Sequence, residues 1–147
     1  MKTPDRLFID TWGTWGWLTL FDDEEKDPER SSRYYRQLRE RNGSVFTTDY
    51  VLDETITLAF QRLPYEHTPE RYQDLRRAQE TGFLDIEWIG PDRFGRAMKL
   101  RQKYDDKPNI SFTDLTSMVV MEELELRDVL TGDAHFEHVG MGFRLQP

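Results

Sequence analysis

Residues 7–10, Leu-Phe-Ile-Asp, form a short apolar run that stops abruptly at an acid. A run of this length is typical of a buried strand, because an apolar helix would show a longer and periodic pattern. The same character recurs farther along the chain, and each recurrence is predicted as a strand. These further strands are expected at Val45-Phe46, Leu84–Ile89, Val129–Thr131 and Gly142–Leu145.

Helical patterns separate the predicted strands. From Asp49 to Leu63 the apolar residues recur every three or four positions, which is typical of an amphipathic helix. The next helix is expected to run from Thr68 to about Gly82, with the Thr68 hydroxyl as its cap and proline in its first position. Further helices are predicted over residues 15–21, 29–41, 90–104 and 111–124.

This alternation of strands and helices predicts an α/β fold with three layers, α/β/α. Its central sheet would be mostly parallel, with four to five strands, and covered by helices on both faces. The chain has 147 residues, of which 37% are hydrophobic, and this is enough for one compact core. Because no linker, low-complexity segment or long repeat interrupts the pattern, residues 1–147 are expected to form a single domain.

Charge and composition narrow the classes of function. The net charge of −8 argues against a protein that coats nucleic acid through its overall field. The absence of cysteine excludes disulfides and thiolate metal sites. Asp5, Arg6 and Asp10 interrupt any apolar signal sequence, and no apolar run approaches the ~20 residues that span a bilayer. We therefore expect a soluble, cytoplasmic protein without a membrane partner.

Two acids follow predicted strands closely: Asp10 after residues 7–9, and Asp133 after residues 129–131. In an open parallel sheet, ligands bind at the carboxyl ends of the strands. Each acid could instead cap the helix or turn that follows it. Two strand-end acids in one small domain favour a shared site over two unrelated caps.

Two more acids lie on predicted helices. Asp114 occupies the fourth position of a capping box that starts at Ser111, and this offers a purely structural explanation for it. It also leads an apolar row with Met118 and Met121, where a buried acid needs a partner or a metal. Glu54 lies at the edge of its helix's apolar stripe, whereas Asp53 falls on the opposite flank.

Four segments carry a family resemblance: LFIDTWG (7–13), FTTDYVLDETITLAF (46–60), SFTDLTSMVVMEELEL (111–126) and VLTGDAHFEHVGM (129–141). They resemble, in order, the signature segments of PIN-domain nucleases. The last two are similar to the S-F-T-D-x-T-S and D-x-H-F-x-x-x-G patterns of VapC-like toxins. The resemblance covers Leu7 to Leu145 and implies that Asp10, Glu54, Asp114 and Asp133 bind metal and carry the catalysis.

Two departures from the family pattern are visible. Thr11-Trp12-Gly13 is followed by Thr14-Trp15-Gly16, like a tandem duplication, so either threonine hydroxyl could lie near the metal. A tryptophan that often precedes the S-F-T-D segment in VapC-like toxins is replaced by Asn109-Ile110, which we interpret as a packing difference.

The resemblance also implies a chemistry. Crowded carboxylates require a cation, and an all-oxygen ligand set favours Mg²⁺ or Mn²⁺, as one ion or two. The expected activity is endoribonucleolytic hydrolysis of single-stranded or looped RNA by a metal-activated water. The enzyme would be a homodimeric toxin, blocked by a cognate antitoxin whose tail lies in the acidic groove. The alternatives are a PIN nuclease of RNA processing or decay without an antitoxin, and a non-catalytic PIN scaffold.

An acidic protein that binds RNA needs a local basic or aromatic surface. Arg96, Lys99 and Lys103 share one face of the predicted 90–104 helix and are candidate RNA contacts, although a solvated stripe would look the same. His135 is expected to face the substrate or support a ligand, and His138 to lie on the surface. The same two explanations apply to Arg30, Arg33, Arg36, Arg39 and Arg41 on the predicted 29–41 helix. A set of aromatic residues could either stack bases or belong to the core or an interface: Trp12, Trp15, Trp17, Tyr34 and Tyr35.

Overall fold

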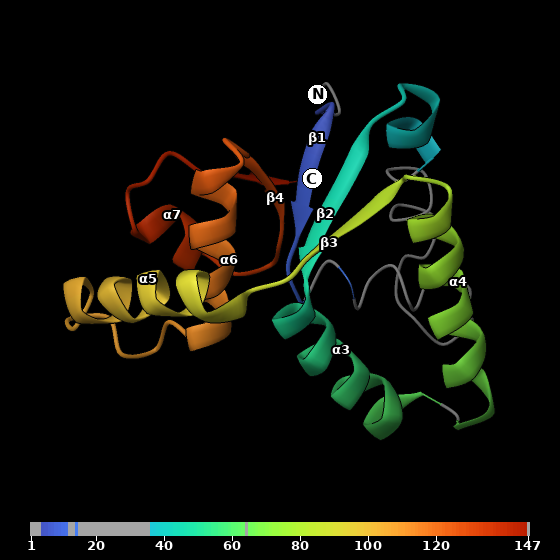
Figure 1. Ribbon diagram of the computed structural model, residues 1–147, viewed down its shortest axis with the longest axis horizontal. Helices are drawn as coiled ribbons and strands as arrows, with labels where there is room; N and C mark the ends of the chain where they lie inside the picture. The colour runs from blue at the N-terminus through green and yellow to red at the C-terminus, as the bar shows by residue number, and fades with distance from the viewer. Residues whose placement is uncertain (1–3, 12–13, 15–35, 64, 147) are drawn as a thin grey trace.

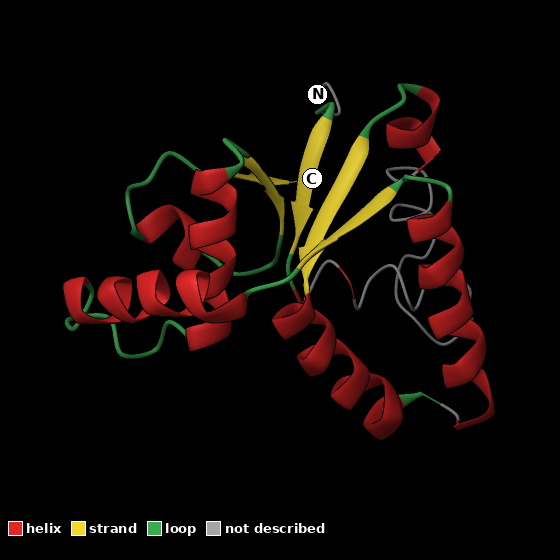
Figure 2. Cartoon of the chain, viewed as in Figure 1, coloured by secondary structure: helices red, strands yellow, loops and turns green. Residues whose placement is uncertain are grey.

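A parallel sheet forms the centre of the protein. The computed structural model describes residues 4–11, 14, 36–63 and 65–146. Within them the strands are β1 (Arg6–Ile9), β2 (Ser44–Thr48), β3 (Leu84–Glu87), β4 (Asp128–Leu130) and β5 (Arg144–Gln146). Their order in the sheet is β3-β2-β1-β4-β5, and every pairing is parallel (Figure 2). The predicted α/β class is confirmed, with five strands and no antiparallel pair in this sheet.

Helices connect the strands as the sequence pattern predicts. They are α3 (Asp49–Arg62), α4 (Thr68–Glu80), α5 (Gly90–Lys103), α6 (Phe112–Glu123) and the four-residue α7 (His135–His138), with a 3₁₀ turn at Tyr65–His67 (Figure 1). Residues 36–40 are helical, in agreement with the predicted 29–41 helix as far as that segment is described. The predicted 15–21 helix lies outside the described residues. No helix in the described part of the chain is long and apolar enough to cross a membrane.

Alternate residues of the strands face two separate hydrophobic cores. On β1, Phe8 packs with one core while Leu7 and Ile9 pack with the other. Neighbouring strands repeat this alternation, because successive side chains of a strand point to opposite faces of the sheet. The first core contains α5 and α6 residues such as Ala97 and Met118, and the second contains α4 residues such as Leu75. The sheet is therefore covered on both faces, as a three-layer fold requires.

The prediction for the start of α4 was wrong in one detail. Thr68 is the first helical residue and not the cap, because the 3₁₀ turn leads directly into the helix and His67 already has helical backbone angles. The Thr68 hydroxyl is consequently buried without a hydrogen-bond partner.

Helix α5 crosses α6 and holds it by contacts on two flanks (Figure 1). On one flank, Arg93 pairs with Glu123 at the carboxyl end of α6, with 2.9 Å between Nη2 and Oε1. On the other flank, the ring of Phe94 packs against Phe112 at the amino end of α6, at 5.0 Å between ring centroids. Opposite flanks of α5 therefore face opposite ends of α6, and this decides which α5 residues lie near the site described below.

Candidate functional site

Asp10 leaves the carboxyl end of β1 and is buried, with 4% of its surface exposed. The hydroxyl of Thr131, just after the neighbouring strand β4, donates a hydrogen bond to Asp10 Oδ2. The same Thr131 oxygen accepts from the backbone amide of Asp133 at 2.9 Å. Thr131 therefore fixes both strand-end acids at once. Sequence reasoning missed this residue, because a hydrogen bond between neighbouring strands leaves no signal in the local sequence.

Glu54 belongs to the second turn of α3 and is held by a hydroxyl from the segment after β1. Thr11 donates to Glu54 Oε2 at 2.7 Å, whereas Thr14 donates to the backbone carbonyl of Asp10 at 2.9 Å. Of the two threonines in the tandem motif, Thr11 is the one that contacts a predicted site carboxylate. Thr14 instead bonds to the backbone four residues before it.

Asp114 lies in the first turn of α6, where half of the predicted capping box is present. The Ser111 hydroxyl accepts from the Asp114 amide at 3.0 Å. The Asp114 carboxyl group faces Asp133 and His135, with 3.7 Å between Oδ2 and His135 Nδ1. Asp133 in turn accepts from the His135 amide at 2.8 Å, so it also supports the turn into α7. Both acids therefore combine a local structural contact with a position in a shared cluster.

The electrostatics of Asp114 show that the four acids converge. Its pKa is raised from 3.8 to about 7, first by desolvation and then by the charges of Asp133, Asp10 and Glu54. A hydrogen bond with Asp133 adds to the rise. Four segments of the chain thus bring Asp10, Glu54, Asp114 and Asp133 close enough for their charges to act on one carboxyl group. Helices α3 and α6, which carry two of them, contact each other.

The chemistry of this cluster suits a hard divalent cation. Ligand atoms of Asp114, Asp133 and His135 lie within 4.8 Å of one another. The His135 Nδ1 atom is buried and makes no hydrogen bond, although it lies 3.0 Å from Asp133 Oδ1. Mutually repelling carboxylates beside an unsatisfied ring nitrogen are the surroundings that a bound cation would neutralise. The residues present therefore fit a metal ion of the Mg²⁺ or Mn²⁺ class, with oxygen as the main ligand type.

The predicted RNA contacts are distributed unevenly around this cluster. Of these, His135 contacts it directly, and His138 is exposed as expected. Arg96 forms an ion pair with Glu123, at the end of α6 opposite to Asp114. Lys99 and Lys103 are exposed. A role of these three cations in RNA binding stays a prediction. The stacking candidates Trp12, Trp15, Trp17, Tyr34 and Tyr35, together with Arg30 and Arg33, lie outside the described residues.

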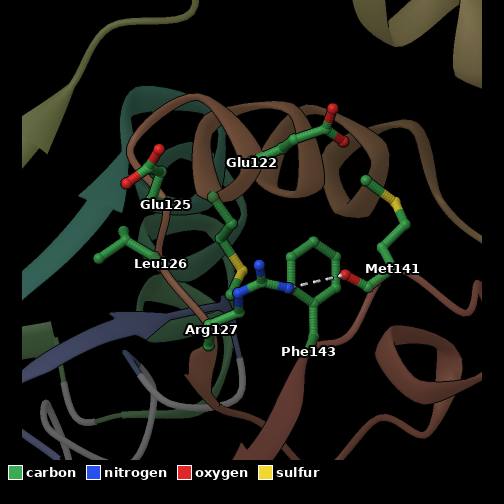
Figure 3. A pocket seen from close by; sticks show the side chains of 7 residues that line it. Glu122, Glu125, Leu126, Arg127, Met141 and Phe143 are labelled. Atoms are coloured by element: carbon green, nitrogen blue, oxygen red, sulfur yellow. Dashed lines mark hydrogen bonds between the residues drawn. The ribbon is translucent and has the colours of Figure 1, made fainter.

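A separate pocket of about 290 Å³ lies at the other end of α6 (Figure 3). Met121, Leu126 and Phe143 contribute apolar surface, and the Arg127 guanidinium donates to the Met141 carbonyl at 3.4 Å. Arg127 precedes β4 whereas Asp133 follows it, so the pocket and the acids lie at opposite ends of that strand. The pocket is therefore not part of the acidic site.

The double contact of Thr131 leads to a stability prediction. In Thr131→Val the shape is conserved, but Asp10 loses a donor and the Asp133 amide loses its acceptor. We expect a loss of about 1–3 kcal/mol in the free energy of unfolding, measured with urea, because buried polar groups are left unpaired. Thr57→Val is the matched control, since its exposed hydroxyl donates only to the Asp53 carbonyl. Equal effects of the two changes would contradict the importance of the Thr131 contacts.

Comparisons with known proteins agree with this architecture. The chain is 30% identical over 95 residues to a VapC ribonuclease of Archaeoglobus fulgidus, a match that covers 64% of this chain and 56% of the relative. The chain thus spans little more than half the length of that relative. Its fold is similar to the crystal structure of Mycobacterium tuberculosis VapC20, described as a sarcin-ricin loop cleaving toxin. The TM-score is 0.69 at 21% identity, over 91% of this chain and 95% of the other.

A family model described as PIN domain matches residues 16–141, which is most of the chain. The matched range contains Glu54, Asp114 and Asp133 and begins shortly after Asp10. Together with the parallel sheet and the acids at its carboxyl edge, this match confirms the resemblance drawn from the sequence motifs. The chain belongs to the PIN domain family.

Proposed function

We propose that this protein is a metal-dependent endoribonuclease and acts as the toxin of a toxin–antitoxin pair. The observation that carries the proposal is the convergence of three further acids on Asp114, whose pKa they help to raise to about 7. A cluster of this kind is costly to fold and is explained by a cation that it holds. The similarity to a VapC ribonuclease and to a toxin described as cleaving the sarcin-ricin loop supports RNA as the substrate.

In the proposed mechanism Asp10, Glu54, Asp114 and Asp133 hold Mg²⁺ or Mn²⁺. The ion would supply a water of lowered pKa and stabilise charge on the scissile phosphate. The protein's own contribution is orientation: Thr131 fixes Asp10 and Asp133, and Thr11 fixes Glu54. His135 borders two of the acids and is 29% exposed, so it is positioned to face the substrate.

The proposal extends to partners. A cognate antitoxin would block the acidic groove with its tail. The enzyme would work as a homodimer in the cytoplasm, where its RNA substrate is found. The family name of the curated relative supports this assignment. A PIN nuclease of RNA processing would have the same site but no such inhibitor, so the inhibitor is the feature that separates the two functions.

The purified protein is expected to cut RNA only when Mg²⁺ or Mn²⁺ is present, because the carboxylates alone repel an attacking anion. The measurement is cleavage of a labelled RNA with Mg²⁺, with chelator, and with Mg²⁺ restored after chelation. Full activity after exhaustive chelation would contradict the metal mechanism. Co-purification with the product of an adjacent small gene, followed by loss of cleavage, would support the toxin assignment. An active enzyme that no neighbouring gene product inhibits would favour RNA processing.

A further inference from the structure

His135 brings an imidazole nitrogen into the acidic cluster. Its Nδ1 atom lies 3.0 Å from Asp133 Oδ1 and 3.7 Å from Asp114 Oδ2. Ligand atoms at neighbouring positions of an octahedral ion lie about 3 Å apart, and those at opposite positions about 4.2 Å, because each is about 2.1 Å from the metal. Both distances fall within this interval. The imidazole nitrogen is therefore spaced from the two carboxylates as ligands of one shared ion are.

The Nδ1 atom has no other use in the protein. It is buried and has no hydrogen-bond partner. At 3.0 Å from Asp133 Oδ1, a ring N–H aimed at that oxygen would donate a hydrogen bond, so the ring nitrogen does not point at it. That oxygen already accepts from the His135 backbone amide at 2.8 Å. A buried nitrogen without a partner is costly, and a bond to a metal ion would satisfy it.

The short helix α7 fixes the position of the imidazole. Its residue Phe136 is fully buried and packs against Phe143 at 6.2 Å between ring centroids. At the end of the helix, the Tyr104 hydroxyl donates to the Val139 carbonyl at 3.1 Å. A ligand on a fixed backbone loses little freedom when it binds an ion. The side chain of His135 is 29% exposed although Nδ1 is buried, so its other edge remains free to face a substrate.

A neutral nitrogen changes which ion the cluster can hold. The charges of the other three acids already help to raise the pKa of Asp114 to about 7, so a fifth carboxylate would add to the repulsion. A neutral imidazole adds a ligand without adding negative charge. Mg²⁺ is bound mainly by oxygen atoms, whereas imidazole is a preferred ligand of first-row transition ions. Carboxylates together with one imidazole should therefore favour an ion such as Mn²⁺.

We propose that His135 Nδ1 binds the metal ion together with Asp114 and Asp133, and that this nitrogen makes the site prefer Mn²⁺ over Mg²⁺. The inference rests on the proposed function and names the ion that the same site selects. The four carboxylates implied by the sequence motifs do not include this ligand. An all-oxygen set of that kind would also not distinguish the two ions in this way.

Calorimetric titration of the metal-free protein, purified without a histidine tag, measures the preference for Mn²⁺ over Mg²⁺. His135→Gln is expected to weaken Mn²⁺ binding about tenfold or more, as loss of a contact around a metal commonly does, and to change Mg²⁺ binding by no more than about threefold. His138→Gln is the matched control, because His138 is exposed on the same helix. Both dissociation constants should be unchanged in this control.

Electron spin-echo spectroscopy of the Mn²⁺-loaded protein measures ligation directly, because a nitrogen bonded to Mn²⁺ couples to its electron spin. The chain has three histidines: His67, His135 and His138. In the double variant His67→Gln/His138→Gln, His135 is the remaining histidine, and the nitrogen signal should persist. Labelling that histidine with ¹⁵N should change the frequency of the signal. This measurement does not depend on whether His135→Gln folds.

Two results would overturn the inference. If Mn²⁺ does not bind, or binds without a nitrogen signal, His135 is not a ligand. If His135→Gln loses Mn²⁺ and Mg²⁺ affinity equally, the ring only positions Asp133. RNA cleavage, measured separately, distinguishes this failure from failure of the proposed function. A protein that binds Mn²⁺ through nitrogen but does not cut RNA keeps the ligand and loses the function, whereas one that cuts RNA without a nitrogen signal loses the ligand alone.

Discussion

Asp114→Asn and Asp10→Asn are each expected to lower kcat/KM for RNA cleavage at least a hundredfold while the protein stays folded. Each change removes one charge at nearly constant volume from a cluster that must hold a cation. Loss of one positioned electrostatic contact in an active site commonly costs two to three orders of magnitude. The measurement is cleavage at saturating Mg²⁺, with circular dichroism to verify the fold.

Asp53→Asn is the matched control for these variants. Asp53 precedes Glu54 in α3 but is exposed on the opposite flank, so the same change of charge occurs outside the cluster. Its cleavage rate should stay within about twofold of wild type. If the Asp10 and Asp114 variants cut RNA as fast as the Asp53 variant, the assignment of the acids as the catalytic centre is wrong.

Metal-free Asp114→Asn is expected to be more stable than metal-free wild type at pH 8. The folded protein raises the pKa of Asp114 from 3.8 to about 7, so the charged form is disfavoured in the native state. At 1.36 kcal/mol per pKa unit, this costs the wild type at most about 4 kcal/mol once the group is ionised. The cost appears as pH rises from about 4 through 7, because the native state then holds a proton that the unfolded chain has already lost. Acidification across that window should stabilise metal-free wild type relative to the variant.

Adding Mg²⁺ should reverse the order of the two proteins. A ligand that binds only the native state stabilises it by roughly 2.7 kcal/mol at a hundredfold excess over its dissociation constant, and the variant lacks one of the ligands. If Asp114 served only to cap α6, its replacement by Asn would lose a favourable helix-dipole contact and destabilise the protein, with or without Mg²⁺. Thermal melts of both proteins, with chelator and with Mg²⁺, distinguish these outcomes through the presence or absence of a crossing.

The sequence predicts most of the fold because local pattern and tertiary structure agree. The apolar run before Asp10 is too short for a helix, and its residues alternate between two cores as a buried strand requires. The start of α4 was missed because Thr68-Pro69 carries a strong local signal that the preceding 3₁₀ turn overrides. Helix α7 has only four residues, which is too short to leave a periodic pattern.

The four candidate acids, whose role as metal ligands stays a prediction, could be proposed from the sequence because strand ends, helix faces and the family motifs are visible in it. The residues that hold them could not, because hydrogen bonds across the sheet leave no local signature. Thr131 and Asp10 are far apart in the chain and meet only when β1 pairs with β4. The sequence could not show whether Thr11 or Thr14 contacts a site carboxylate, because this depends on which hydroxyl reaches Glu54 on α3. The crossing of α5 over α6 decides which flank of α5 faces which end of α6, and helical spacing alone cannot show this.

The pairing of β1 with β4 has a consequence for synthesis of the protein. Asp10 leaves the ribosome first and cannot contact Thr131 or Asp133 until they are made, 121 and 123 residues later. The intervening β2 and β3 can assemble beside β1 earlier, but the fourth acid is missing until residue 133 has been translated. A chain released before residue 133 therefore has no complete cluster. For a toxin of the proposed kind, such fragments would be harmless, and toxicity would require synthesis beyond that residue.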